Sequence, residues 1–254
     1  MFRVFRIFLL LGILLLAGGV TYWERWVVSQ WTHPLTVVIY PVNGDGSDNT
    51  QHYIDGLTTG HFQEISTFLA KQGERYRLKK LPLPVVQLGQ QTKLIPPSPS
   101  ATGSSGVFTS LVNSLKLRYF VFRNTPFFDS LGKIRIFVVF HAAEGEKPLQ
   151  HSLGSQKGLF GLVHAFSEPG QDDQNNIVIT HEILHTLGAT DKYDANNQPI
   201  HPDGFGDPEA SRLYPQKVAE IMAGRIAISP AKAVMPNNLM GCVIGYKTAH
   251  EINW

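Results

Sequence analysis

The sequence has little cysteine, little net charge and no internal repeat. Its one cysteine, Cys242, excludes an intramolecular disulfide and a zinc cluster built from cysteines. Lysine and arginine number 22 against 20 aspartate and glutamate, and no block of like charge occurs. The chain therefore lacks the basic pattern of a nucleic-acid-binding protein. Its 254 residues, 43% of them apolar, suffice for one sizeable core and predict one main domain.

The N-terminus carries the longest apolar run. Arg3 and Arg6 precede an uncharged stretch from Ile7 to Trp23, and these 17 residues nearly cover a hydrocarbon core of about 30 Å. We predict an N-terminal transmembrane helix that serves as a membrane anchor over residues 1–27, followed by a short tether over residues 28–34.

Two interpretations of this segment stay open. In an uncleaved anchor, the aromatic residues Tyr22, Trp23 and Trp26 form an interfacial belt. In a cleaved signal peptide, Ala17 and Gly19 are the small residues at the cleavage site, and the protein is secreted. Under either interpretation, the positive-inside rule puts the rest of the chain outside the cytoplasm. The first gives a single-pass inner-membrane protein with a periplasmic domain.

Strand and helix patterns alternate through the remaining domain, residues 35–254. Buried strands are predicted over Leu35–Asn43, Lys133–Ala142 and Gly158–Phe166, and a proline-interrupted, non-central strand over Leu81–Gln90. Helices are predicted over Thr50–Lys71, over Val107–Leu117 and from Ile177 onward, and a polar loop over Pro96–Gly106. This order predicts an α/β (α+β) fold, a mixed sheet with helices packed on it.

The stretch "HEILHTLGATDKYD" carries the chemistry. On a helix, His181 and His185 share a face and can direct two imidazole nitrogens at one zinc ion. Glu182 lies one residue further round, where it can take a proton from a metal-bound water. Gly188 can adopt positive φ and end the helix, so that the chain turns back and brings Asp191 to the metal as the third ligand.

Other acids compete with Asp191 for that role. Asp194 is the nearest alternative, and Glu209 and Glu220 are more remote ones. The loop "DANNQPIHPDGFGDPE" also carries acids and carbonyls that suit calcium, but a solvated loop is the preferred explanation for them.

At this point the sequence resembles the metzincin metalloproteases. "HEILHTLGATD" is similar to their extended zinc motif, with aspartate as third ligand as in the snapalysin-like branch. The resemblance implies a mixed twisted sheet with an antiparallel edge strand, an active-site helix and a methionine turn beneath the zinc. Met222 in "AEIMAGRI" is the candidate for that turn, with Met235 and Met240 as rivals.

A second resemblance concerns the strand before the motif. "GLVHAF" (Gly161–Phe166) is similar to the edge strand of matrix metalloproteinases, which binds substrate by backbone pairing. It implies a substrate-binding edge at Leu162, Val163, His164 and Ala165. His164 also matches a structural-zinc histidine of that family, but the other ligands of that site are not in place.

Together these features predict a zinc metallopeptidase with one catalytic ion, in which Glu182 is the general base. Its partner is a peptide or protein substrate, and a peptidoglycan cross-link is a further possibility. The competing hypothesis is a non-catalytic envelope protein that keeps the zinc fold as a scaffold. The intact Glu182 counts against it, because a scaffold has no need of that base.

Overall fold

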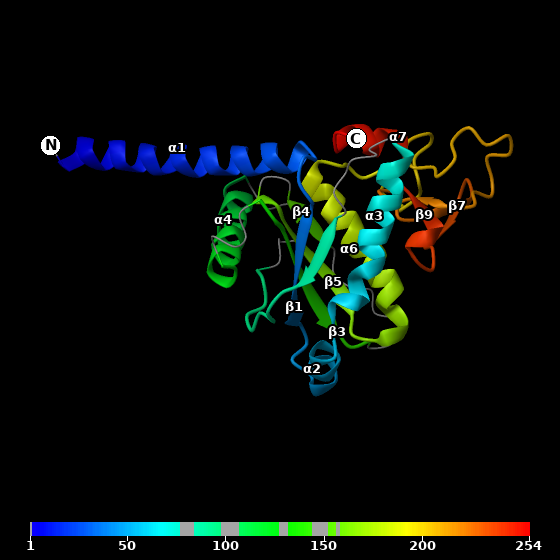
Figure 1. The fold of residues 1–254 in the computed structure, drawn as a ribbon, viewed down its shortest axis with the longest axis horizontal. Coiled ribbons are helices and arrows are strands. Elements are labelled where there is room, and N and C mark those ends of the chain that lie inside the picture. Colours follow the sequence, from blue (N-terminus) through cyan, green and yellow to red (C-terminus); the bar gives the residue numbers. More distant parts are fainter. Residues whose placement is uncertain (1, 77–83, 98–106, 127–131, 144–151, 156–157) are drawn as a thin grey trace.

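A computed structural model describes residues 2–76, 84–97, 107–126, 132–143, 152–155 and 158–254. Its helices and strands follow in the order α1 Phe2–Ser29, β1 Thr36–Asn43, α2 Asp48–Asp55, η1 Thr59–Phe62, α3 Gln63–Arg75, β2 Val85–Leu88, α4 Val107–Asn124, β3 Ile134–His141, β4 Leu153–Ser155, β5 Phe160–Phe166, η3 Pro169–Gln171, α6 Asp172–Leu187, β6 Ala219–Glu220, β7 Ile226–Ser229, β8 Lys232–Val234, η4 Leu239–Gly241, β9 Cys242–Val243 and α7 Tyr246–Glu251. Figure 1 shows their arrangement in space.

The central sheet is mixed and mostly parallel, which confirms the predicted α/β class. Its strand order is β2-β1-β3-β5-β4. The first four strands run parallel, and only β4 is antiparallel to its neighbour β5. β2 lies at one edge, as the prolines that precede it in the sequence predict, and β4 lies at the other.

Helices cover both faces of the sheet. On one face, side chains of β1, β3 and β5 such as Ile39, Ile136 and Val163 pack with α3 and α6 in one core cluster. On the other face, the alternate side chains, such as Tyr40 and Phe137, pack against α4. This division follows from the period of two along a strand, and the near-continuous apolar sequences of β1 and β3 reflect burial on both sides.

Local signals explain where several helices begin and end. The predicted helix over Thr50–Lys71 is divided into α2 and α3. Ser47 caps α2 by accepting a hydrogen bond from Thr50 N, and Gly56 ends that helix. In contrast, α6 begins at Asp172, five residues before the predicted start, because acidic residues in its first turn suit the positive end of the helix dipole. The predicted loop Pro96–Gly106 lies largely outside the described residues.

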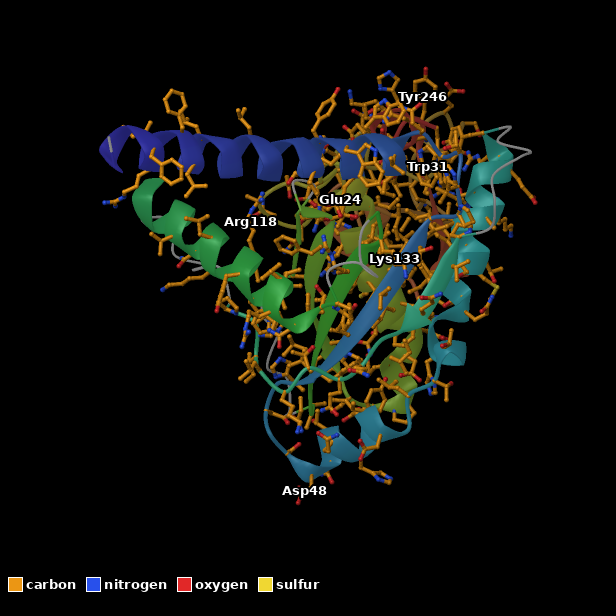
Figure 2. All side chains as sticks on the ribbon, turned by 60° about the vertical axis from the view of Figure 1, so that its left-hand side comes forward. Glu24, Trp31, Asp48, Arg118, Lys133 and Tyr246 are labelled. Atoms are coloured by element: carbon orange, nitrogen blue, oxygen red, sulfur yellow. The ribbon has the colours of Figure 1, made fainter. Side chains whose placement is uncertain are left out.

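Helix α1 extends away from the sheet (Figure 1). Its outer part exposes apolar side chains, including Phe8 and Leu15, whereas its last turns join the core through Val28. Glu24 is buried and accepts a hydrogen bond from Gly132 N, and Trp31 donates from its indole nitrogen to Ile252 O. Figure 2 shows Glu24 and Trp31 where this end of α1 meets the body of the molecule.

The predicted transmembrane helix is not supported. Among the residues that the structure describes, no helix combines the length and the apolar character needed to cross a bilayer.

The predicted substrate edge at Gly161–Phe166 is wrong in its position. The segment forms β5, which pairs with β3 on one side and with β4 on the other. Leu162, Val163, His164 and Ala165 are all buried, and His164 N donates to Ser152 Oγ. The antiparallel edge that the fold prediction required is present, but β4 supplies it. An apolar run buried on both faces marks an inner strand, and this signal outweighs the motif likeness.

Candidate metal centre

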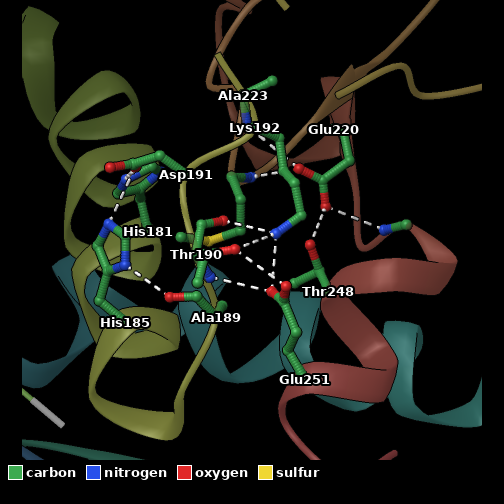
Figure 3. A network of polar contacts seen from close by, with 12 residues as sticks. His181, His185, Ala189, Thr190, Asp191, Lys192, Glu220, Ala223, Thr248 and Glu251 are labelled. Carbon is green, nitrogen blue, oxygen red and sulfur yellow. Dashed lines mark hydrogen bonds and ion pairs between the residues drawn. The ribbon is translucent and has the colours of Figure 1, made fainter. Parts of the chain in front are cut away.

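The histidine motif lies on the last two turns of α6. Gly188 follows the helix at φ 116° in the left-handed region, as predicted, and its backbone N donates to Leu184 O and His185 O. The chain then reverses direction and returns beside the helix. This reversal places Asp191 next to both histidines, as Figure 3 shows.

Three ligand atoms converge at this point. The Nε2 atoms of His181 and His185 each lie 3.1 Å from Asp191 Oδ1. Zinc bonded to tetrahedral donors at about 2.0–2.1 Å would hold those donors about 3.3 Å apart. The observed separations are therefore close to those of a zinc site with His181, His185 and Asp191 as its protein ligands.

The second nitrogen of each ring fixes its tautomer. His181 Nδ1 lies 3.0 Å from Ile221 O, and His185 Nδ1 lies 2.8 Å from Ala189 O. A carbonyl oxygen only accepts, so both Nδ1 atoms carry the proton and donate it. In the neutral rings both Nε2 lone pairs then point toward the Asp191 oxygen. This arrangement is repulsive by itself and favourable around a cation, so the residues fit a metal ion.

Without a metal ion, a proton on His185 Nε2 can take the place of the cation and bond to Asp191. Burial by itself lowers the pKa of His185, but the hydrogen bond to Asp191 and the nearby negative charges outweigh it and raise that pKa. Burial raises the pKa of Asp191, yet its contacts with His181 and His185 bring it well below its usual range. The carboxylate therefore stays ionised, as a metal ligand must.

Glu182 lies beside these ligands and is buried. His181, Glu182 and His185 each offer a ligand atom within 4.8 Å of the others. Two donors to one zinc ion lie at most about 4.2 Å apart, twice the bond length. The 3.1 Å contacts of Asp191 Oδ1 with both histidine nitrogens satisfy this limit. Asp191 and Glu182 are thus the two carboxylates that lie with His181 and His185 at this point.

The structure excludes two of the competing ligands. Asp194 Oδ1 accepts hydrogen bonds from Asn196 N and Gln198 N, so it closes its own turn. Glu220 is buried, and its two oxygens accept from the backbone of residues 222, 223 and 245 and from Thr248 Oγ1. The third, Glu209, is exposed.

The proposed calcium loop does not form a comparable site. In the described part of the chain, the group of three histidine or acidic residues that could hold a metal ion lies at the motif on α6, and none lies in this loop.

Met222 lies in a tight turn whose preceding residue, Ile221, contacts His181. Gly224 N and Ala223 N both donate to Glu220 O, and Met222 is fully buried. Ile221 O accepts from His181, and Met222 O accepts from Lys192 N at 3.0 Å. The turn thus contacts His181 directly and also holds Lys192, the residue that follows Asp191. Met235 lies partly buried at the edge of the core, and Met240 is exposed.

Sequence reasoning missed the groups that hold the ligands in place. The carbonyls of Ile221 and Ala189 carry no sequence signal, because every residue has one. Tyr193 was visible only as part of the motif; its ring lies 6.4 Å from that of His181, and Asp191 is close enough to raise its pKa. Burial and the Asp191 charge raise the pKa of Tyr193 to about 12, so the hydroxyl stays protonated.

No protein-family profile matches this chain, and no curated protein is similar to it.

Proposed function

We propose that the protein is a zinc-dependent metallopeptidase, with zinc held by His181, His185 and Asp191. The observation that carries the proposal is the convergence of two histidine Nε2 lone pairs on one carboxylate oxygen, each at 3.1 Å. Glu182, a buried carboxylate, lies next to this point. Three protein ligands leave one position for water or substrate, which is the pattern of catalytic rather than structural zinc.

The architecture supports a metzincin-like arrangement. β4, the antiparallel edge strand, packs beside α6, which carries the motif. The turn that contains Met222 contacts His181 through Ile221 O. Both features agree with the resemblance of the motif. The proposed substrate strand is therefore β4, at which an extended peptide would add as a further strand.

The protein groups divide the chemistry among them. When bound, zinc polarises the scissile carbonyl and acidifies the attacking water. Glu182 accepts the proton of that water and then delivers it to the leaving amine. The Tyr193 hydroxyl stays protonated near Asp191 and is placed to orient this ligand. The side chain of Asp191 is 44% exposed, whereas those of His181 and His185 are 13% and 19% exposed, so substrate approaches from the Asp191 side.

A scaffold without catalysis is the second candidate, because it would use the same three ligands. The two candidates differ at Glu182, which contributes no metal bond in either. We expect Glu182→Gln to keep its zinc and its fold but to lose roughly 10²–10⁴-fold in peptide cleavage.

The assay is cleavage of a diverse peptide library followed by mass spectrometry, with zinc content measured on the same samples. Glu209→Gln, at an exposed position, is the matched control and should cleave like the wild type. Equal cleavage by wild type and Glu182→Gln would refute the mechanism. Zinc-loaded wild type that cleaves no peptide would favour the scaffold.

We also propose that the domain is exported, on the basis of Arg3 and Arg6 before the apolar run. Alkaline phosphatase fused after Trp254 should be active in cells, and a reporter that works only in the cytoplasm should be silent. The opposite pattern would reject export. The mass of the intact N-terminus distinguishes a retained from a cleaved segment.

A further inference from the structure

Lys192 follows the third ligand and is unusually buried for a lysine, with its side chain 5% exposed. Its Nζ donates to Glu251 Oε2 at 2.7 Å, to Thr190 O at 2.7 Å and to Thr190 Oγ1 at 2.8 Å. These contacts use all three donors of the ammonium group. A buried lysine is rarely found without such pairing, so this position is built for its partners.

Glu251, in the last turn of α7, completes the arrangement. Thr190 N donates to its Oε2 at 3.0 Å, and Thr190 Oγ1 donates to its Oε1 at 2.9 Å. Burial raises the pKa of Glu251, but its bonds from Lys192 and Thr190 outweigh this and lower it, so the carboxylate is ionised. Figure 3 shows the network beside the two histidines.

The network holds the residues on both sides of Asp191. Thr190 is bound through its backbone N, backbone O and hydroxyl, and Lys192 is bound through its ammonium and through its backbone N to Met222 O. The Asp191 side chain itself is 44% exposed, so packing contributes little to its position. Its backbone is fixed by its neighbours instead.

We propose that Lys192 and Glu251 are positioning residues that hold Asp191 in its ligand geometry, so that the C-terminal helix α7 sets the metal affinity. The inference rests on the metal site of the proposed function. A ligand on a free loop loses conformational entropy when metal binds, whereas a loop already fixed does not. Loss of an outer-shell partner of a metal ligand typically weakens metal binding about 10–100-fold.

The test is zinc affinity of the full chain, measured by competition with a chromogenic chelator, for Glu251→Gln, Lys192→Met and the double variant. We expect each single variant to bind zinc about 10–100-fold more weakly than the wild type. The double variant should be no weaker than the weaker single one, because both residues act through one contact. With Co²⁺ as probe, the visible absorption should lose intensity, since a displaced Asp191 disturbs the tetrahedral ligand set.

A purely structural role for the pair makes a different prediction. The matched control is Tyr76→Phe, which removes a 2.7 Å hydrogen bond to Ile244 O in the same C-terminal segment but touches neither Thr190 nor Lys192. This variant should lose thermal stability in its metal-free form and keep its zinc affinity. Thr190→Val, which removes one hydroxyl and keeps the ion pair, should show a smaller loss of affinity and serves if Glu251→Gln does not fold.

Two results would overturn the inference. One is zinc binding by Glu251→Gln, or by Thr190→Val where the former does not fold, that equals the wild type. The other is an affinity loss in Tyr76→Phe as large as in Glu251→Gln. Neither affects the proposed function, whereas a wild-type chain that binds no zinc would remove the site on which both rest.

Discussion

The molecule contains two histidine pairs that differ in what surrounds them. His181 and His185 on α6 share a carboxylate oxygen at 3.1 Å, and each is held by a backbone carbonyl at Nδ1. His141 on β3 and His164 on β5 bond to each other, Nε2 to Nδ1 at 3.0 Å, with ring centroids 5.3 Å apart. The first pair directs two lone pairs outward at one point, and the second uses its facing nitrogens internally.

The two pairs also differ in charge. The pKa of His185 is raised, because the Asp191 hydrogen bond and nearby acids outweigh burial. The pKa of His164 is lowered to about 4 by burial and by the adjacent His141. Of these two pairs, therefore, only His181 and His185, which share contacts with the Asp191 carboxylate, suggest a metal site. His164 is a strand side chain, as its missing partner ligands predict, although it lies on an inner strand.

The largest expected effect is the loss of metal from one pair only. His185→Ala removes a ligand and should lower zinc from about one equivalent per chain to near none by elemental analysis. His141→Ala is the matched control and should keep the full equivalent. The reverse result, with zinc lost from His141→Ala and retained in His185→Ala, would assign the metal to the other pair.

The next effect tests the carboxylate that distinguishes the pairs. Asp191→Asn keeps the shape of the side chain but removes its charge, so zinc affinity should fall by more than the about 10–100-fold typical of an outer-shell partner. Asp194→Asn changes a carboxylate that only closes its own turn and should leave the affinity unchanged. Chelator competition measures both, and equal losses would remove the assignment of Asp191.

A smaller effect concerns the pH dependence of stability, measured by urea unfolding of the zinc-free protein. The pKa of His164 falls from 6.5 to about 4 on folding, so the unfolded chain binds the proton first. The contribution of the neutral His164 ring to the free energy of unfolding is therefore complete above pH 6.5. It is lost between pH 6.5 and about 4, by up to about 3 kcal/mol.

Burial also lowers the pKa of His141, so His141 likewise stabilises the folded protein more at higher pH. The pKa of His185 is raised, so its contribution to stability falls as pH rises. His164→Gln should consequently flatten the slope of unfolding free energy against pH in this window. An unchanged slope would mean that His164 is not buried as a neutral ring.

The smallest expected effect is at Tyr193. Tyr193→Phe removes the hydroxyl near Asp191, and the zinc affinity should fall about fivefold, equivalent to ~1 kcal/mol. Tyr246→Phe, at a position 80% exposed, is the control and should bind zinc like the wild type. A full loss of zinc in Tyr193→Phe would show that the hydroxyl does more than orient one ligand.

The sequence by itself determined the local part of this site. The spacing of His181 and His185 places both on one face of α6, because a helix repeats every 3.6 residues. Gly188 ends that helix at a positive φ, which a residue with a Cβ atom would adopt only at a cost in free energy. The return of Asp191 follows from this reversal over three residues. Each of these steps depends on backbone geometry within about two turns.

Only the tertiary structure decided the rest. Ile221 O lies 40 residues from His181, and Glu251 lies 59 residues from Lys192, so no local period links them. The exclusion of Glu220 depended on four donors, two in its own turn and two that lie 25 and 28 residues further along the chain. β5 is an inner strand because β4 pairs with its second side. The apolar run in the sequence predicts a strand there but does not specify which strands pair with it. Pairing across a sheet is set by how whole elements pack, because an inner strand and an edge strand share the same local backbone conformation.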